Sequence, residues 1–358
     1  MGKYLGFPLK HPGTNNQEFG FVLDRVKKKL SGWKANLLSM AGRTVLIQAS
    51  CSTIPAHVMQ NAYLPNKILE GMDRVNRNFL WGSTDNSKKM HWVNWRKVTR
   101  PKDVGGLGLQ TTKGRNIAFL AKLNWRLHTE GNALWARVLK AKYSTRQRIE
   151  ERNKSRLPCS PTWRGVMKGE AVFKKGVKWI PSFESNLSFW FDCWTNLGPL
   201  RQVIHGPLTH ETSSLKIRDV AAPYGWDWSV IPFVFPPELK AEIQAIPTPI
   251  VARGGDKLAW SHSPKGTFSL GRTYCLANEV PNEETFSGGW IWKLNALPTI
   301  QNFVWKCMHN SVGVKECLVR RGVSQDPICP LCHIESESIN HALRDCELIK
   351  LIWVQLEF

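Results

Sequence analysis

Four residues near the C-terminus have the types and the spacing of a metal site. Cys329 and Cys332 are separated by two residues, His341 follows after eight more, and Cys346 after a further four. Thiolates and imidazole are ligands that zinc prefers, and a Cys-x-x-Cys pair lets both sulfurs face one point from a tight turn. Three thiolates, one imidazole and Zn²⁺ leave no open coordination position. The pattern therefore predicts a structural zinc site rather than a catalytic one.

The alternative interpretation is a cluster of buried cysteines with one hydrogen-bonded histidine. His333 fits the ligand set less well because it adjoins Cys332, and neighbouring side chains diverge. Cys307, His309 and Cys317 lie upstream at helical spacing, so we expect them in the core or on the surface.

The spacing of the last two ligands constrains the element that carries them. Five positions turn an ideal helix by about 500°, which would leave His341 and Cys346 about 140° apart. We therefore expect the helix through 338–350 to end or distort near Asp345, or to begin close to His341.

Periodicity along the rest of the chain predicts an α+β fold that is predominantly helical. Val22, Val26, Leu30 and Leu37 follow one helical stripe, and so do Ile68, Met72 and Phe79. A third stripe contains Ile300, Phe303, Val304 and Cys307. Expected helices cover 17–38, 41–52, 66–82 (with Asn66 as cap), 114–128, 132–143 and 299–322. Strand-like pieces lie at 91–95, 177–180 and 187–190, a linker at 150–162, and long loops with little regular structure at 196–256.

Charge is distributed very unevenly along the 358 residues. The whole chain carries a net charge of +21, but residues 1–180 hold 34 basic and 10 acidic residues, and residues 181–358 hold 15 and 18. A folded half-chain this basic favours a polyanionic partner, with nucleic acid first and an anionic membrane surface second. A solvated surface without a partner is the alternative.

Composition and cysteine usage limit the class of protein. Hydrophobic residues make up 42% and charged residues 22%, which excludes wholesale disorder. No apolar run approaches the roughly 18 residues of a membrane-spanning helix, and the N-terminus lacks the features of a signal peptide. Nine cysteines, an odd number, favour reduced thiols, so we expect an intracellular protein of the nucleus or cytoplasm.

Several segments together resemble the C-terminal part of plant non-LTR (LINE-type) retrotransposon reverse transcriptases. The resemblance runs over nearly the whole chain, in family order, and accounts for most of the 17 tryptophans. The segments that carry it are Tyr4–Leu9, Leu30–Lys34, Leu38–Arg43, Phe79–Gly82, Gly105–Leu109, Thr162–Arg164, Phe189–Trp194, Trp290–Lys293, Gln301–Lys306 and the Cys/His tail.

The resemblance implies a domain order and a set of roles. Residues 1–150 would be a basic, helical thumb and connection region that grips a template–primer duplex. Residues 151–256 would be a linker with a Trp-rich loop and strand segment. Residues 257–358 would be the small helical zinc-binding domain, with Cys329, Cys332, His341 and Cys346 as ligands.

The same resemblance implies that catalytic residues are missing. In the family, the Tyr-x-Asp-Asp polymerase segment precedes the segment at Tyr4, and a ribonuclease H domain follows the zinc domain in many relatives. Phosphoryl transfer needs such carboxylates to hold metal ions. The pair Glu283-Glu284 lies in a polar stretch without the family's aromatic residue, and Asp192, Asp219, Asp227 and Asp256 are scattered. We therefore expect no catalytic residues in this chain.

Three functions follow from these observations and remain open at this point. The first is a catalytically incomplete reverse-transcriptase fragment that binds RNA or DNA without sequence specificity. In it, phosphates would be contacted by Arg25, Lys28, Lys29, Arg43, Arg74 and Arg77. The second is a zinc-stabilised protein-interaction module, whose partners the sequence does not name. The third, an active polymerase or ribonuclease H, would need carboxylates that cannot be assembled from this sequence.

Overall fold

The computed structural model describes residues 3–4, 7–8, 19–31, 37–84, 86–143, 159–182, 184–223, 225–246, 255–279 and 286–356. The chain divides into two compact units, and each contains more than one segment of the sequence. The first contains residues 1–58, 64–113 and 280–358, and the second contains residues 59–63 and 114–279.

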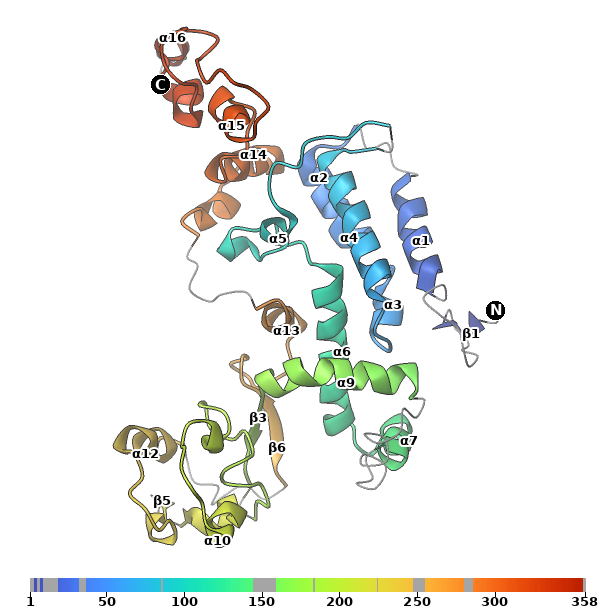
Figure 1. The fold of residues 1–358 in the computed structure, drawn as a ribbon, viewed down its shortest axis with the longest axis vertical. Coiled ribbons are helices and arrows are strands. Elements are labelled where there is room, and N and C mark those ends of the chain that lie inside the picture. The colour runs from blue at the N-terminus through green and yellow to red at the C-terminus, as the bar shows by residue number, and fades with distance from the viewer. Residues whose placement is uncertain are drawn as a thin grey trace. The chain divides into compact units, whose positions relative to one another are not determined.

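The first unit contains mostly helices (Figure 1). Its N-terminal elements are β1 (Lys3–Tyr4), β2 (Phe7–Pro8), α1 (Gly20–Ser31), α2 (Met40–Leu46), the π-helix η3 (Ile47–Cys51), α3 (Ala56–Met59, which ends in the second unit), α4 (Asn66–Trp81), α5 (Trp95–Val98) and the 3₁₀ helix η4 (Lys102–Val104). Its C-terminal elements are the 3₁₀ helix η7 (Gly289–Lys293), α14 (Pro298–Met308), α15 (Lys315–Arg320), the π-helix η8 (His341–Asp345) and α16 (Glu347–Gln355).

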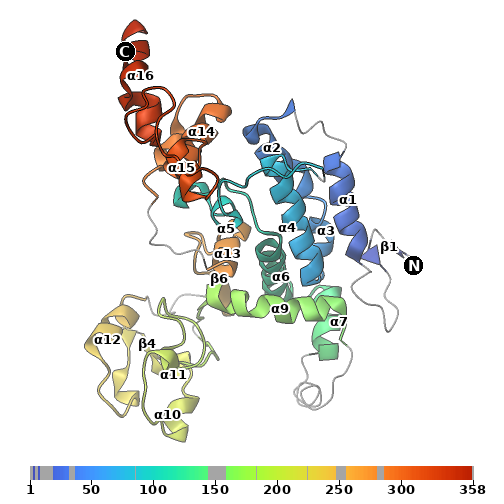
Figure 2. The same cartoon turned by 45° about the horizontal axis from the view of Figure 1, so that its top comes forward.

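Helices α1 and α4 lie side by side and share a core (Figures 1 and 2). The predicted stripe of α1 is buried at Val22, Val26 and Leu30, but Leu37 lies beyond the helix and is 78% exposed. Helix α4 begins at Asn66 with Pro65 as its N-cap, and it ends where Gly82 adopts φ +74°, so its predicted end is correct but its predicted cap is not.

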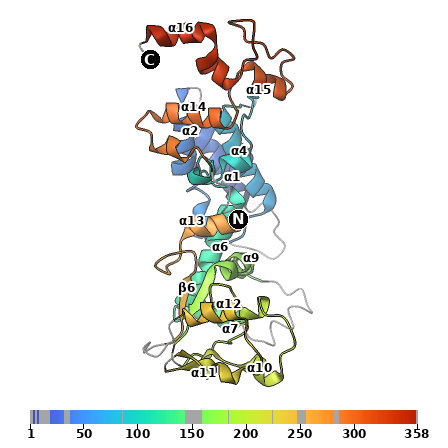
Figure 3. The same cartoon turned by 90° about the vertical axis from the view of Figure 1, so that its left-hand side faces the viewer.

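The Gly-rich turn at 105–109 contacts the C-terminal part of the first unit. The Gly105 carbonyl accepts hydrogen bonds from Trp305 Nε1 at 2.9 Å and from His309 Nε2 at 2.8 Å. A side chain at Gly105, which has φ +85°, would meet the ring of Phe286. Helix α14 also packs on α2 (Figure 3). The end of the chain that carries the Cys/His cluster therefore lies in the same compact unit as the N-terminal helices.

The second unit combines helices with two short antiparallel pairs, β3 with β6 and β4 with β5. Its helices are α6 (Thr112–Thr129, which begins in the first unit), α7 (Leu134–Tyr143), α9 (Pro161–Gly176), η5 (Leu200–Gln202), α10 (His210–Ser214), α11 (Ile217–Val220), η6 (Trp228–Val230), α12 (Pro237–Gln244) and α13 (Leu270–Ala277). Its strands are β3 (Val177–Ile180), β4 (Ala221–Ala222), β5 (Gly225–Trp226) and β6 (Lys257–Trp260).

Helix α9 is an element that the sequence analysis missed. It crosses α6 (Figure 1), and glycines make the close approach possible. A Cβ at Gly169 would lie 2.3 Å from the backbone carbon of Leu120, and one at Gly165 would meet the Leu120 side chain. Its glycines have low helix propensity, which weighs against a helix even though the buried residues recur at helical spacing. The predicted linker at 150–162 falls partly outside the described residues, and its last two residues begin α9.

The expectation of long loops at 196–256 is wrong for the described part of that range. Phe189, Trp190 and Trp194 are fully buried in a core that short helices and the β4–β5 pair surround. The indole nitrogens of Trp190 and Trp194 donate to the carbonyls of Thr212 and Phe189, at 2.6 and 2.9 Å. Tryptophans in irregular segments form a hydrophobic core here, although the sequence of this region contains no long periodic stretches.

Three other local predictions also differ from the structure. Residues 187–190 form no strand, and Ser188 makes only an isolated bridge to Lys216. Residues 91–94 form no strand, and Trp95 begins helix α5. The predicted helix over 299–322 is divided into α14 and α15, and α14 buries Asn302 and Trp305 while Ile300 and Phe303 are exposed. The predicted helices at 114–128 and 132–143 are confirmed as α6 and α7, and the strand at 177–180 as β3.

At the level of the whole fold, the predicted class is confirmed. The described residues form a predominantly helical α+β structure in which each strand has two to four residues. The three predicted domains, 1–150, 151–256 and 257–358, stay a prediction.

Candidate metal centre

A short hairpin holds the first two candidate ligands. Ile328 and Ser336 form an antiparallel bridge, and the Cys329 N–H donates to the Glu335 carbonyl at 2.8 Å. The turn closes where the His333 N–H donates to the Cys329 carbonyl at 3.0 Å, with His333 in the left-handed region at φ +56°. This turn points the Cys329 and Cys332 side chains toward the same region.

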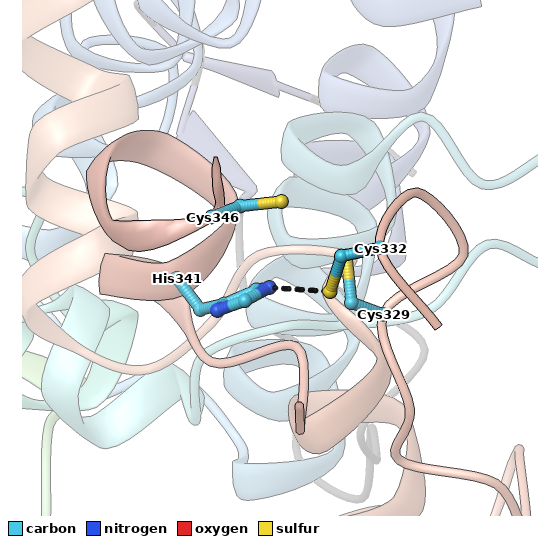
Figure 4. A group of neighbouring side chains, drawn as sticks. All are labelled: Cys329, Cys332, His341 and Cys346. Carbon is cyan, nitrogen blue, oxygen red and sulfur yellow. Dashed lines mark hydrogen bonds between the residues drawn. The ribbon is translucent and has the colours of Figure 1, made fainter. Parts of the chain in front are cut away.

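A break between two helical segments positions the other two ligands. His341 begins the π-helix η8, and its N–H donates to Ser338 Oγ at 3.1 Å. Cys346 ends η8 with extended backbone angles, φ −62° and ψ 130°, and is at the same time the N-cap residue of α16. The predicted interruption near Asp345 is therefore confirmed. It brings the Cys346 side chain to the side on which His341 lies (Figure 4).

The four ligand atoms are close enough to share one ion. They all lie within 4.8 Å of one another, and Cys332 Sγ lies 3.4 Å from His341 Nε2. A tetrahedral zinc with bonds of about 2.3 Å to sulfur and 2.0 Å to nitrogen would hold its sulfurs about 3.8 Å apart and sulfur and nitrogen about 3.5 Å apart. Within the described ranges, this is the group of Cys, His, Asp or Glu side chains placed to hold a metal ion.

Backbone N–H groups around the sulfurs favour the thiolate form, which is the form that binds a cation. The pKa of Cys332 is lowered to about 6, because the N–H groups of Glu335 and then Ile334 donate to its sulfur. Burial raises the pKa of Cys346, and the N–H groups of Ile349 and Leu348 oppose that effect. Burial lowers the pKa of His341, but the thiols of Cys329 and Cys332 raise it by more. Cys332 therefore forms a thiolate more readily than Cys346 does.

Glu335 is a residue of the site that the sequence analysis missed. Its Oε2 lies 3.1 Å from His341 Nδ1, on the side of the ring opposite the sulfurs. A carboxylate there fixes the imidazole with its proton on Nδ1 and leaves Nε2 free for a metal. No spacing rule indicated this role, because a surface glutamate six residues before a histidine is common.

The six predicted phosphate-binding cations have different surroundings. Arg25, Lys28 and Lys29 on α1 and Arg74 on α4 are exposed or half-exposed at the surface, whereas Arg43 and Arg77 are half-buried. Arg43 Nη1 donates to the Leu80 carbonyl at 3.4 Å, near the C-terminus of α4, and burial lowers its pKa. Four of the six cations thus lie at the surface, whereas Arg43 donates to the backbone of α4.

Comparison with known proteins places the metal cluster in a family. Residues 268–353 match the family described as zinc-binding in reverse transcriptase. The C-terminal region is similar to that family. The resemblance inferred from the sequence is therefore confirmed, and all four candidate ligands fall inside the matched range.

Two curated relatives extend the comparison beyond the metal cluster. A protein of Arabidopsis thaliana with the name "Putative ribonuclease H protein" is 35% identical over 359 residues, covering 98% of this chain and 57% of the relative. An "Uncharacterized mitochondrial protein" of Arabidopsis thaliana is 28% identical over 152 residues, covering 41% of this chain and 98% of the relative. The chain thus spans little more than half the length of the first relative. Together with the matched family model, these similarities indicate a retrotransposon-related protein.

No solved structure matches the chain. Among the helices that the structure describes, none is both long enough and apolar enough to cross a membrane.

Proposed function

We propose that this chain is the nucleic-acid-binding, catalytically incomplete part of a retrotransposon-type reverse transcriptase, and that it carries a structural zinc ion. The observation that carries the proposal is the concentration of positive charge on the N-terminal helices of the unit that contains the metal cluster. That charge fits a phosphate backbone, and contacts of this kind depend on salt and not on base sequence.

The cations on α1 form the core of the proposed interface. Lys28 and Lys29 follow Arg25 by three and four residues, so the three cations lie on one side of the helix. The adjacent side of the helix carries Val22, Val26 and Leu30, which are buried. Helix α1 therefore presents its cations outward because its apolar stripe fixes its orientation.

The proposed metal is zinc, in a structural role. Three thiols and an imidazole form a closed set of four ligands, which suits zinc and leaves no position for a substrate. The zinc would join the hairpin at Cys329 to the start of α16 and so stabilise the end of the chain. Zinc supplies folding free energy in such sites and needs no chemical step.

The proposed absence of catalysis agrees with the local roles of the acidic residues. Asp192 accepts from the Ser188 N–H at 2.7 Å, Asp227 from the Ser229 N–H at 2.9 Å, and Asp256 from the Ser182 N–H at 2.8 Å. Asp192 and Asp227 hold their own turns, and Asp256 joins two segments that are distant in the sequence. We assign them to backbone capping rather than to metal-assisted phosphoryl transfer.

The test is a binding titration of the full chain with a labelled RNA–DNA duplex, measured by fluorescence anisotropy at several salt concentrations. The triple variant Arg25→Ala/Lys28→Ala/Lys29→Ala should bind more weakly and reduce the slope of log K against log salt by about one unit for each phosphate that is no longer bound. The matched control is Lys257→Ala/Lys265→Ala/Arg272→Ala, which removes three exposed cations elsewhere and should leave the slope unchanged.

Equally weakened binding in both triple variants would show that only the overall charge matters, and the α1 interface would be wrong. No binding at low salt by the wild-type chain would remove the nucleic-acid function altogether.

One specific observation favours protein binding as the second candidate function. Helix α16 exposes Leu348, Leu351, Ile352 and Val354, an unusual density of apolar side chains on a nine-residue helix. A zinc-stabilised module that docks through this helix is the function we would adopt if the titrations showed no nucleic-acid binding.

A further inference from the structure

An apolar and aromatic surface on η7 and α14 is not explained by the functions above. We define the η7–α14 face by five exposed side chains from two adjacent elements and the loop between them, namely Trp290, Leu294, Leu297, Ile300 and Phe303. Trp290 is 49% exposed and Phe303 is 41% exposed. Such contiguous apolar surfaces on a folded protein commonly mark binding sites.

The orientation of α14 is fixed by contacts on its other side. Trp305 is fully buried, with its Nε1 bonded to the Gly105 carbonyl, and Asn302 Nδ2 donates to the Pro298 carbonyl at 2.7 Å. Rotating α14 to bury Ile300 and Phe303 would break the hydrogen bond of Trp305 in the core. The apolar stripe therefore faces outward because of the fold and not because the helix is loosely placed.

The charges around the η7–α14 face are almost all positive. Residues 286–315 contain three lysines, Lys293, Lys306 and Lys315, and no aspartate or glutamate. Helix η4 packs against η7 and adds Lys102, whose Nζ lies 4.5 Å from the centre of the Trp292 ring. Asp103, next to Lys102, is the acidic neighbour that η4 contributes.

Two pairs bring aromatic and cationic groups together on this face. Lys293 follows Trp290 by three residues in η7, and Lys306 follows Phe303 by three residues in α14. Side chains three residues apart on a helix lie on the same side. Each exposed ring therefore has a lysine close to it. A ligand that carries both aromatic bases and phosphates can contact both groups.

We propose that the η7–α14 face binds a single-stranded segment of nucleic acid, with unstacked bases on Trp290 and Phe303 and phosphates on the neighbouring lysines. Single-strand sites combine a basic track with aromatic rings on which bases stack, without sequence preference. A duplex offers phosphates, but its base faces are stacked on one another and cannot stack on the exposed rings. The proposal rests on the proposed nucleic-acid function and assigns to it a second, chemically different surface.

The experiment compares three ligands with the full, zinc-loaded chain by fluorescence anisotropy. They are an oligothymidine of about 20 nucleotides, longer than a typical single-strand site of roughly 4–16 nucleotides, an abasic strand of equal length and charge, and an RNA–DNA duplex. Wild type should prefer the oligothymidine to the abasic strand. Trp290→Ala and Phe303→Ala should each weaken oligothymidine binding about fivefold or more and leave abasic-strand and duplex binding unchanged.

The matched control is Phe191→Ala, which removes an aromatic ring that is 57% exposed in the second unit and should change none of the three affinities. Thermal melting and zinc content confirm that each variant is folded. Equal wild-type affinity for the oligothymidine and the abasic strand would overturn the single-strand site while duplex binding still supported the α1 interface. Absence of duplex binding alone, with the preference for bases retained, would overturn the α1 interface instead.

Discussion

Cys346 combines two structural roles. Its backbone ends η8 and begins α16, and its buried sulfur completes the set of four candidate ligands. Serine at this position can cap a helix but does not bind zinc as a thiolate does. Substitution of single residues therefore tests the metal centre most directly.

We predict that Cys346→Ser preserves the α16 cap and loses the metal. The wild-type chain should contain one zinc per molecule by inductively coupled plasma mass spectrometry, and the variant much less than one. Cys275→Ser, at a half-buried cysteine outside the cluster, is the control and should retain the ion. A variant with full zinc content would show that the cluster is a group of buried cysteines instead.

Glu335 should tune the affinity for the metal without binding it. Glu335→Gln weakens the acceptor for His341 Nδ1, so zinc affinity should fall by about tenfold, the lower end of the usual range because the carboxylate is largely exposed. Competition with a chromophoric chelator measures this. Glu347→Gln, an exposed glutamate that bonds Lys350, should behave like wild type. Equal affinities in all three proteins would leave Glu335 without a role at the site.

At the scale of elements, the crossing of α6 and α9 depends on glycine. Gly169→Ala would place a methyl group against the Leu120 backbone, and we expect the free energy of unfolding, measured with urea, to fall by about 1–3 kcal/mol. Gly271→Ala in α13 is the matched control, because no atom lies within 4 Å of its added Cβ. It should be neutral or slightly stabilising. Equal effects would mean that the helices separate easily.

The contact between α14 and the Gly105 turn should depend on pH. Burial lowers the pKa of His309; the Gly105 carbonyl opposes this, and Lys97 and Arg100 add to it. A depressed pKa means that the unfolded state binds the proton more readily, so the contribution of His309 is present above about pH 6.5 and is lost as the pH falls toward the folded value.

His309→Gln should therefore show a flatter decline in the urea midpoint between pH 7.5 and 5.5 than wild type does, at matched zinc content. Identical slopes in both proteins would show that His309 titrates normally in the fold.

At the scale of the whole molecule, the metal cluster and the Trp-rich core lie in different units. The four ligands belong to the first unit, whereas Phe189, Trp190 and Trp194 belong to the second. Hydrogen exchange after chelation should accelerate in residues 328–356 and remain unchanged in residues 184–246. Faster exchange in both ranges would show that the zinc stabilises the entire chain as one cooperative structure.

The sequence by itself determined the features that depend on nearby residues. The clustering of the four candidate ligands, the interruption near Asp345, the limits of α4 and the buried stripe of α1 all follow from spacings of fewer than 20 residues. Ligand geometry and the helical period act over that range, so they can be recognised in one sequence. The uneven distribution of charge along the chain was also evident from the sequence, because it follows from counting basic and acidic residues.

Tertiary structure decided the features that depend on distant partners. Trp305, and not the stripe of Ile300 and Phe303, faces the core because Gly105, 200 residues earlier, offers its carbonyl there. Helix α9 forms against α6 despite its glycines, and Glu335 reaches His341 only after the hairpin has closed. A local pattern states which side chains are apolar, but the free energy of burial is realised only where another segment covers them.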